Sequence, residues 1–340
     1  MKLASFALND TPDVARLAFV IDDTTWFPLT EACQTAGTTL PLIPLTIHHA
    51  IEAGPDVWHE LARIAESLAS LWSSRSLTTS TKLTPLDLGA LTVLPAVQTP
   101  SKLACLALNN SANVDRIVRG PSHPAVFTKP LTALVGHGSP IRLKPHYGRV
   151  HPEPELAVII GKRATDIAAA DAYDHVFGYT IHNDLTSPTM RDEDSFHYRA
   201  IHPAAEGDGE GIRYVESHVS YSGRYKGSDT FSALGPWIVT KDEISDPHSL
   251  DISCHVRDEC FASDNTVNLF HKVPEVLAFL SGYMTLLAGD VVSMGTALAS
   301  GGKPGRAVQN ADLNKMGGPV SVTIERIGTL SNPVSRGRGA

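Results

Sequence analysis

The chain has 340 residues, of which 28 are lysine or arginine and 36 are aspartate or glutamate, so its formal net charge is −8. An acidic chain of this kind is a poor partner for nucleic acid or for an anionic membrane surface, and we expect neither. Hydrophobic residues make up 42% of the sequence and charged residues 19%, which excludes extensive disorder and is typical of a folded protein with one or two domains.

In the first 95 residues, a strand-like run at residues 17–21 precedes one clear helical pattern. Apolar residues at 57, 61, 64, 68 and 71 are spaced for one face of a helix, and Asp56 is expected to cap its start. The Ser/Thr-rich stretch 73–84 predicts a connector, followed by an extended segment. We therefore expect residues 1–95 to form a small N-terminal α+β domain with its linker.

From residue 96 to residue 335, short apolar runs alternate with glycine and proline, a pattern that predicts many short strands. One helix is expected to open at Pro274 and to end near Gly289. The fold class is therefore mixed but β-rich (α+β), with the strands of residues 96–335 closing into a sandwich or barrel. Residues 336–340 are expected to be a frayed tail.

The four cysteines, Cys33, Cys105, Cys254 and Cys260, have no pair with C-x-x-C spacing, so we expect reduced thiols rather than a zinc or redox site. The first residues lack a charged segment followed by a long apolar one, and no run approaches roughly 18 apolar residues. These features predict a cytoplasmic protein without a membrane partner.

The most informative segment is residues 151–161, with the sequence HPEPELAVIIG. In an extended strand, Glu153 and Glu155 point to the same side, and His151 joins them if the strand runs that far back. Two adjacent carboxylates repel each other, and a divalent cation offsets this repulsion, because hard oxygen ligands suit Mg²⁺, Mn²⁺ or Ca²⁺. The apolar residues after Glu155 predict a strand that is buried on both faces and holds the pair rigidly.

A second strand-like run, residues 177–184, ends in His182, Asn183 and Asp184. Asp184 could complete a three-carboxylate metal site, in which water or substrate fills the remaining positions. Taken alone, a Glu-x-Glu pair is more often a solvated strand face, and an aspartate at a strand end is more often a turn residue. The residues by themselves leave both interpretations open.

Five motifs follow one another along the chain: ExELAVIIG from Glu153, GYTxxND from Gly178, KGSDTFxxLGPW from Lys226, VPExxxFLS from Val273, and GDVVxxGT from Gly289. This series resembles the longer, two-domain members of the fumarylacetoacetate hydrolase family, over roughly residues 97–333. The resemblance implies a mixed β-sandwich roll, a homodimer, and activity on small β-dicarbonyl acids from the breakdown of aromatic compounds.

The resemblance also implies roles for individual residues. The matching ligands of magnesium or manganese are Glu153, Glu155 and Asp184. Lys226 matches a lysine that is directed at a substrate oxygen, where an ammonium stabilises developing negative charge. The residues expected to bind substrate are Thr296, which matches a carboxylate anchor, Gly295 and Asn183.

The sequence departs from the family in three places. Hydrolytic members commonly carry LNYxDHxxE in a lid segment, and its histidine and glutamate activate water. The matching residues 108–116 place Asn113 and Arg116 at those two positions, and asparagine cannot accept a proton at neutral pH. The family's SARD is replaced by TSPT at 186–189, and its GTP by GTA at 295–297. The substrate surroundings therefore differ from those of hydrolytic members.

Three hypotheses follow for the reaction. In the first, the protein hydrolyses an acylpyruvate-like β-diketo acid or a related enol-lactone through a metal-bound enolate, with His182 as the substitute base because it shares a strand face with Asp184, or else His151. In the second, it is an isomerase, tautomerase or decarboxylase of a 2-oxo acid and needs no activated water. In the third, it is a weakly active protein that binds dicarboxylates.

Overall fold

The computed structural model describes residues 1–38, 40–75, 83–206, 210–299 and 307–337. Its main sheet has the strand order β3-β2-β1-β13-β10-β9-β16-β5-β6, with β4 beside β1 and β7 beside β13. The strands of this sheet are β1 (Lys2–Leu8), β2 (Thr11–Asp22), β3 (Thr25–Pro28), β4 (Leu91–Val93), β5 (Leu103–Ala107), β6 (Ala125–Lys129), β7 (Leu134–Val135), β9 (Pro154–Ile160), β10 (Val176–Asp184), β13 (Ser232–Thr240) and β16 (Val291–Thr296).

The three central strands β9, β10 and β13 are buried at every residue. This agrees with the apolar run in β9 and with the largely apolar sequences of β10 and β13, which are typical of strands covered on both faces. Strand β10 pairs antiparallel with β9 on one side and with β13 on the other. The end of β10 that carries His182, Asn183 and Asp184 therefore lies between two buried strands.

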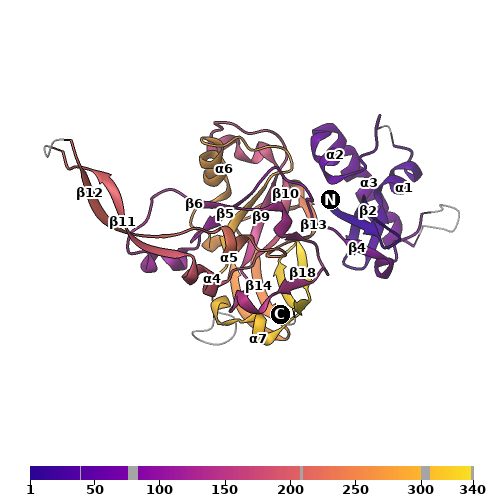
Figure 1. Cartoon of the computed structure of the whole chain (residues 1–340). Coiled ribbons are helices and arrows are strands. Elements are labelled where there is room, and N and C mark those ends of the chain that lie inside the picture. The colour runs from indigo at the N-terminus through magenta and orange to yellow at the C-terminus, as the bar shows by residue number, and fades with distance from the viewer. Residues whose placement is uncertain (39, 76–82, 207–209, 300–306, 338–340) are drawn as a thin grey trace.

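The N-terminal part joins the main sheet instead of forming a sheet of its own. Residues Lys2 and Leu3 of β1 pair with Val239 and Ile238 of β13. Three helices, α1 (Leu29–Thr35), α2 (Ile47–Glu52) and α3 (Pro55–Ser73), pack beside these strands at one end of the molecule (Figure 1). Strands from both sides of residue 95 therefore belong to one hydrogen-bonded sheet, and the expected domain boundary near residue 95 stays a prediction.

Helix α3 confirms the expected helix but corrects its start. The helix begins at Pro55 with Gly54 at the N-cap position, and Asp56 lies within the first turn. An aspartate in the first turn still favours the helix, because its charge opposes the helix dipole. Most of the expected connector 73–84 lies outside the described residues.

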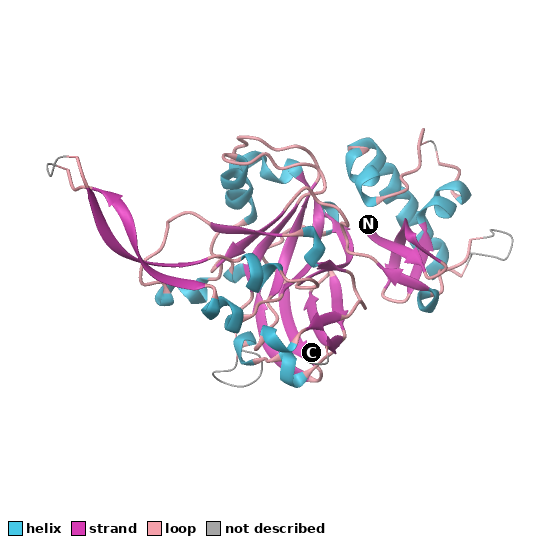
Figure 2. Cartoon of the chain, viewed as in Figure 1, coloured by secondary structure: helices cyan, strands magenta, loops and turns pink. Residues whose placement is uncertain are grey.

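A second sheet covers the main one and gives the expected β-rich roll. Its strands, in the order β15-β14-β17-β18, are β14 (Asp251–Val256), β15 (Glu259–Asn265), β17 (Val320–Ile324) and β18 (Gly328–Asn332). Side chains such as Cys254 and Val322 share one core with Leu156 and Tyr179 of the main sheet. The sandwich of two facing sheets is visible in Figure 2.

Helix α6 (Val273–Ser281) has Pro274 in its first turn, as expected, but it ends before Gly282 and not near Gly289. Gly289 has a φ of +83° and belongs to the turn that leads into β16. The described part of the chain contains no helix that is long and apolar enough to cross a membrane. All four cysteines are free thiols, as expected.

A two-stranded arm extends from the body at the end opposite to the N-terminal helices (Figure 1). It consists of β11 (Ser195–Pro203) and β12 (Ile212–Ser220), and the short helices α4 (Pro188–Glu193) and α5 (Gly223–Gly227) flank it in sequence. The remaining strands are β8 (Ile141–Leu143) and β19 (Val334–Arg336), and the remaining α-helix is α7 (Leu313–Met316). Arg336 pairs with Leu143 of β8 and the Gly337 N–H donates to the Leu143 carbonyl at 2.8 Å, so these two residues are not frayed, and the rest of the expected tail, 338–340, lies outside the described residues.

Candidate metal centre

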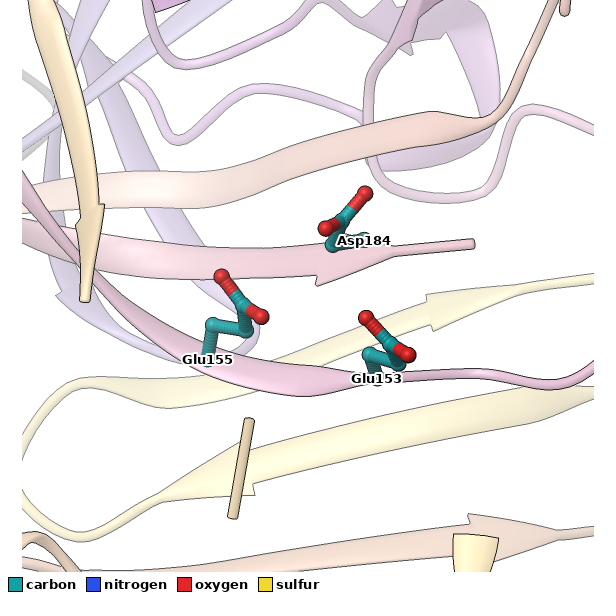
Figure 3. A group of neighbouring side chains, drawn as sticks. All are labelled: Glu153, Glu155 and Asp184. Atoms are coloured by element: carbon teal, nitrogen blue, oxygen red, sulfur yellow. The ribbon is translucent and has the colours of Figure 1, made fainter. Parts of the chain in front are cut away.

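Three carboxylates converge at the ends of the central strands β9 and β10. Glu155 lies within β9, Glu153 directly precedes it, and Asp184 is the last residue of β10. The Asp184 N–H donates to the Glu153 carbonyl at 2.9 Å, which fixes the two strand ends side by side. One oxygen of each carboxylate lies within 4.8 Å of the others (Figure 3). The structure therefore brings together the three residues expected to bind a metal.

Two buried lysines balance part of the charge of this cluster. The Lys226 ammonium lies 2.5 Å from Glu153 Oε2 and 2.7 Å from Asp184 Oδ2. Lys129 pairs with the other oxygen of Asp184 and is itself buried. The three carboxylates and two ammoniums sum to one net negative charge, so a divalent cation would leave the site positive and suited to an anionic substrate.

The pKa values of these groups follow from burial and charge. Burial alone would raise the pKa of Asp184, but the ammoniums of Lys129 and Lys226 outweigh it and hold that pKa well below its usual range. Burial alone would lower the pKa of Lys226, but Asp184 and Glu153 raise it above its usual range. Both groups are therefore charged at neutral pH.

Glu155 is oriented by three donors. It accepts hydrogen bonds from Ser293 Oγ at 2.5 Å, from Thr296 Oγ1 at 3.0 Å and from the Gly295 N–H at 3.3 Å. Burial raises the pKa of Glu155, and its contact with His182 opposes that rise. A hydroxyl has one hydrogen, so Thr296 either orients Glu155 or donates to a substrate carboxylate, but not both at once.

The donor set fits a divalent cation. Glu153, Glu155 and Asp184 offer only hard oxygen atoms, which magnesium, manganese and calcium prefer. The carboxylate most exposed to the adjoining space is Glu153, whose side chain is 13% exposed against 1% for the other two. Any ligand positions left open by the protein would therefore face that space.

A cavity of about 290 Å³ adjoins the cluster on the Glu153 side. Its wall includes Asn113 and Arg116 from the lid segment, in the 3-10 helix Ser111–Arg116, together with His151 and Lys226. Neither an asparagine amide nor a guanidinium accepts a proton at neutral pH. The structure thus confirms that the segment lacking the family's histidine and glutamate lies at the site.

The two histidines proposed as bases occupy different places. His182 is fully buried, and its ring nitrogens contact Ser293 Oγ at 2.8 Å and Ser232 Oγ at 2.7 Å, so it does not line the cavity. His151 does line the cavity, and its Nδ1 lies 3.2 Å from the Pro152 carbonyl. Burial lowers the pKa of His151. The geometry therefore favours His151 over His182 as the group that reaches substrate.

The residues expected to bind substrate differ in whether they line the cavity. Thr296 lines the cavity, but Asn183 does not, and Asn183 Oδ1 instead accepts a hydrogen bond from the Glu153 N–H at 3.0 Å. Asn183 thus fixes the backbone of a metal ligand. Gly295 has a φ of +94° and donates its N–H to Glu155. The roles of these three residues toward substrate stay predictions.

Sequence reasoning missed Lys129 and Ser293. Lys129 follows the apolar run 125–127 and precedes Pro130, and a lone lysine at the end of an apolar strand is the signal that could have found it. Ser293 is a single serine within the otherwise apolar run 291–294 of β16, and nothing in the local sequence shows what its hydroxyl contacts. Both residues act on the carboxylates through contacts between distant parts of the chain.

Comparison with known proteins places this site in a family. Residues 102–335 match the family model described as fumarylacetoacetate (FAA) hydrolase C-terminal. Protein Rv2993c of Mycobacterium tuberculosis is 35% identical over 237 residues, which cover 69% of this chain and 76% of that protein. Oxaloacetate tautomerase fahd2, mitochondrial, of Xenopus laevis is 32% identical over 247 residues, which cover 72% and 68%.

A solved structure resembles the whole chain. The 5-carboxymethyl-2-hydroxymuconate delta-isomerase from Mycobacterium smegmatis aligns with a TM-score of 0.64 and 26% identity, covering 99% of this chain and 100% of that one. The sequence match and the structural likeness agree with the motifs and the fold described above. The chain belongs to the fumarylacetoacetate hydrolase family, which includes enzymes such as the tautomerase and the isomerase named above.

Proposed function

We propose that the chain is a divalent-metal-dependent tautomerase or isomerase that interconverts the keto and enol forms of a small 2-oxo acid. One observation carries this proposal: Asn113 and Arg116 line the cavity where the family pattern has a water-activating histidine and glutamate. Moving a proton within a substrate needs no activated water. The tautomerase and isomerase activities named for the two similar enzymes above support the same reaction class.

The residues of this chain divide the work as follows. Glu153, Glu155 and Asp184 hold the cation, which when bound supplies positive charge that orients a 2-oxo acid and stabilises the negative charge developing on it. Lys226 lines the cavity and donates a hydrogen bond to the substrate oxygen on which that charge develops.

His151 carries the proton in this proposal. If its Nδ1–H donates to the Pro152 carbonyl, as their 3.2 Å contact indicates, Nε2 is free to accept a proton. Nε2 takes the proton from the carbon next to the keto group and returns it to the substrate oxygen, so no proton is gained or lost overall. The lid segment carries no second base, and a reaction that transfers a single proton needs only one.

Hydrolysis, the first of the three hypotheses drawn from the sequence, is the second candidate, and the position of His151 is the observation that favours it. The same imidazole could activate a water molecule for attack on an acylpyruvate-like β-diketo acid or an enol-lactone. In that case His151, and not His182, would be the substitute base, because only His151 lines the cavity. The two candidates differ in whether a carbon–carbon or ester bond is broken.

The test is a keto–enol assay with oxaloacetate, followed by the absorbance of the enol, in the presence of Mg²⁺ or Mn²⁺. We expect metal-dependent acceleration that is lost in Glu155→Gln and retained in Glu60→Gln, whose carboxylate pairs with Arg63 on α3. Acetylpyruvate is tested in parallel for cleavage to acetate and pyruvate. Cleavage without acceleration of enol exchange would favour the hydrolase and contradict the tautomerase.

A further inference from the structure

Two histidines face each other on the arm that β11 and β12 form. His197 of β11 lies directly opposite His218 of β12, and the two imidazole rings stack with their centroids 4.0 Å apart and their planes 7° apart. Both residues are exposed. The arm extends from the body, whereas the three clustered carboxylates lie at the ends of central strands of the main sheet (Figure 1). The histidine pair is therefore separate from the carboxylate cluster.

A carboxylate lies beside this pair. Glu216 is two residues before His218 in β12, so their side chains share one face of the arm. In the register of the strands Glu216 lies opposite Arg199, and its Oε2 lies 3.9 Å from His197 Nε2. The side chain of His197 is 58% exposed and that of Glu216 is 71% exposed, so both can change rotamer without repacking. One face of the arm thus presents two imidazoles and a carboxylate together.

The ring nitrogens of the pair are available to a ligand. Among the residues that the structure describes, neither imidazole has a hydrogen-bond partner. His182 differs in this respect, because both of its ring nitrogens contact serine hydroxyls. The register of β11 and β12 holds His197 and His218 side by side, so a ligand that uses both rings finds them already close together.

These donors suit zinc. Zinc binds histidine nitrogen and carboxylate oxygen at about 2.0–2.2 Å, and two histidines with one glutamate and a water form a tetrahedral site. Two nitrogens of such a site lie about 3.4 Å apart, slightly less than the separation of the two stacked rings. A tilt of each ring therefore directs one nitrogen from each toward a shared ion. Magnesium prefers a full set of oxygen ligands, which fits the carboxylate cluster better than a site with two imidazoles.

We propose that His197, His218 and Glu216 form a second metal site, which binds Zn²⁺ and thereby cross-links β11 and β12. A two-stranded sheet alone is marginally stable in water. Because the ligands come from both strands, the ion binds only the paired arm and adds to its stability. This role is independent of the reaction at the carboxylate cluster.

The test is isothermal titration calorimetry of the full chain with Zn²⁺ in excess Mg²⁺, which occupies the carboxylate cluster. We expect a saturable zinc site that persists in Glu155→Gln. His197→Gln and His218→Gln should each weaken zinc binding at least about tenfold, because losing a residue that merely supports a ligand already costs about that much. Glu216→Gln should weaken it less, since the amide oxygen of glutamine still offers a lone pair.

His202→Gln is the matched control, because His202 is exposed on the same strand but faces the other side of the arm, opposite Arg213. It should keep the zinc affinity within about threefold. Equal losses in His202→Gln and in the variants of the pair would show adventitious binding to exposed histidines and overturn the proposal. It is also overturned if the unaltered chain binds no zinc, or if the double variant His197→Gln with His218→Gln binds zinc as tightly as the unaltered chain.

Amide hydrogen exchange tests the cross-link itself. Zn²⁺ should slow exchange at the paired amides of β11 and β12 in the unaltered chain and should not slow it in the double variant. Without zinc, thermal unfolding of the unaltered chain and the variants should coincide, because the substituted side chains are exposed. Exchange in the arm that zinc leaves unchanged in the unaltered chain overturns the cross-link.

Discussion

Lys226 Nζ lies 2.7 Å from one oxygen of Asp184, and Lys129 donates to the other oxygen of the same carboxylate. The two lysines are not equivalent. Lys226 also reaches Glu153 and lines the cavity, whereas Lys129 is buried outside the cavity wall and donates to the Phe231 carbonyl at 2.6 Å. Lys129 is therefore placed to stabilise the cluster, and Lys226 to meet the substrate.

We expect Lys129→Met to lower the free energy of unfolding by about 3 kcal/mol, because removing one partner of a buried pair leaves Asp184 poorly compensated. Added Mn²⁺ should restore part of this loss, since a ligand that binds only the folded state adds to its stability. Urea unfolding with and without Mn²⁺ measures both effects.

The control for this prediction is Lys102→Met. Lys102 pairs with the buried Asp290 at 2.5 Å, and Asp290 is not one of the three clustered carboxylates. This variant should also be destabilised, but Mn²⁺ should stabilise it no more than the unaltered protein. An equal gain from Mn²⁺ in both variants would show that the cation does not bind at Asp184.

Ser293 and Ser232 contact opposite nitrogens of His182, but only Ser293 also donates to Glu155. Residues that orient a metal ligand typically contribute tenfold or more to metal affinity. We therefore expect Ser293→Ala to weaken Mn²⁺ binding about tenfold in isothermal titration calorimetry. Ser232→Ala removes a hydroxyl from the same ring and should change the affinity less than threefold, roughly. Similar losses in both variants would mean that His182, and not Ser293, orients Glu155.

Gly295 approaches the lid closely. A Cβ at this position would lie 2.9 Å from Asn109 Cβ, and the backbone φ is +94°. Gly295→Ala should therefore cost about 1–2 kcal/mol from the left-handed backbone and a further 1–3 kcal/mol, roughly, from overpacking. The matched variant is Gly138→Ala, where φ is +77° and nothing lies within 4 Å, so only the first cost applies. Thermal unfolding of both variants separates the two effects, and equal losses would contradict a close contact with the lid.

The positions of Glu153, Glu155 and Asp184 could be predicted because each depends on local periodicity and on a strand that ends in polar residues. The same period of two places His182 on the face of Asp184, but it does not indicate how deeply a side chain is buried. His182 lies opposite Glu155 in the neighbouring strand, two residues before Asp184, and its two ring nitrogens contact Ser293 and Ser232. Depth depends on packing from distant segments.

Pairings between distant parts of the chain could not be predicted from the sequence either. Lys129 and Asp184 are separated by 55 residues, and β1 joins β13 across more than 230 residues. No local pattern links Lys2 with Val239, so the sequence did not indicate that β1 pairs with β13. The predicted start of α3 and the predicted end of α6 were wrong by a few residues. Asp56 and Gly289 are residue types that are common at helix ends, but α3 begins at Pro55 and α6 ends at Ser281.

Asp264 provides a pH-dependent contribution to stability away from the carboxylate cluster. Burial alone would raise its pKa, but hydrogen bonds from the Asn268 side chain and from the backbone N–H groups of Ala299, Asn265 and Leu298 outweigh it, so the pKa of Asp264 is lowered. A carboxyl with a lowered folded pKa stabilises the protein above its unfolded pKa of about 4, and this contribution is lost as the pH falls through the folded value.

Asp264→Asn should therefore be less stable than the unaltered protein at about pH 6, and the difference should shrink as the pH falls toward about pH 3. Urea unfolding across this range measures the difference. Asp258→Asn, at an exposed position in the turn between β14 and β15, serves as the control and should follow the unaltered protein. A constant difference between Asp264→Asn and the unaltered protein at every pH would show that the charge of Asp264 does not matter.

The arm formed by β11 and β12 is the surface through which we expect the chain to form a homodimer. The two strands form a sheet of their own, and a two-stranded sheet alone is marginally stable in water. The arm exposes Ile201 and Tyr214, which lie opposite each other, at 66% and 63%. Arg199 lies opposite Glu216 on the same arm, so charges of both signs flank the exposed apolar residues.

We expect light scattering coupled to size exclusion to show a dimer for the unaltered chain and a monomer for the double variant Ile201→Glu with Tyr214→Glu, because four buried carboxylates would oppose association. Val118→Glu, at an exposed apolar residue outside the arm, should remain dimeric. Thermal unfolding of the double variant checks that the body stays folded. A dimer that survives both substitutions would place the interface on another face, because apolar contacts of the arm could not then be holding the two copies together.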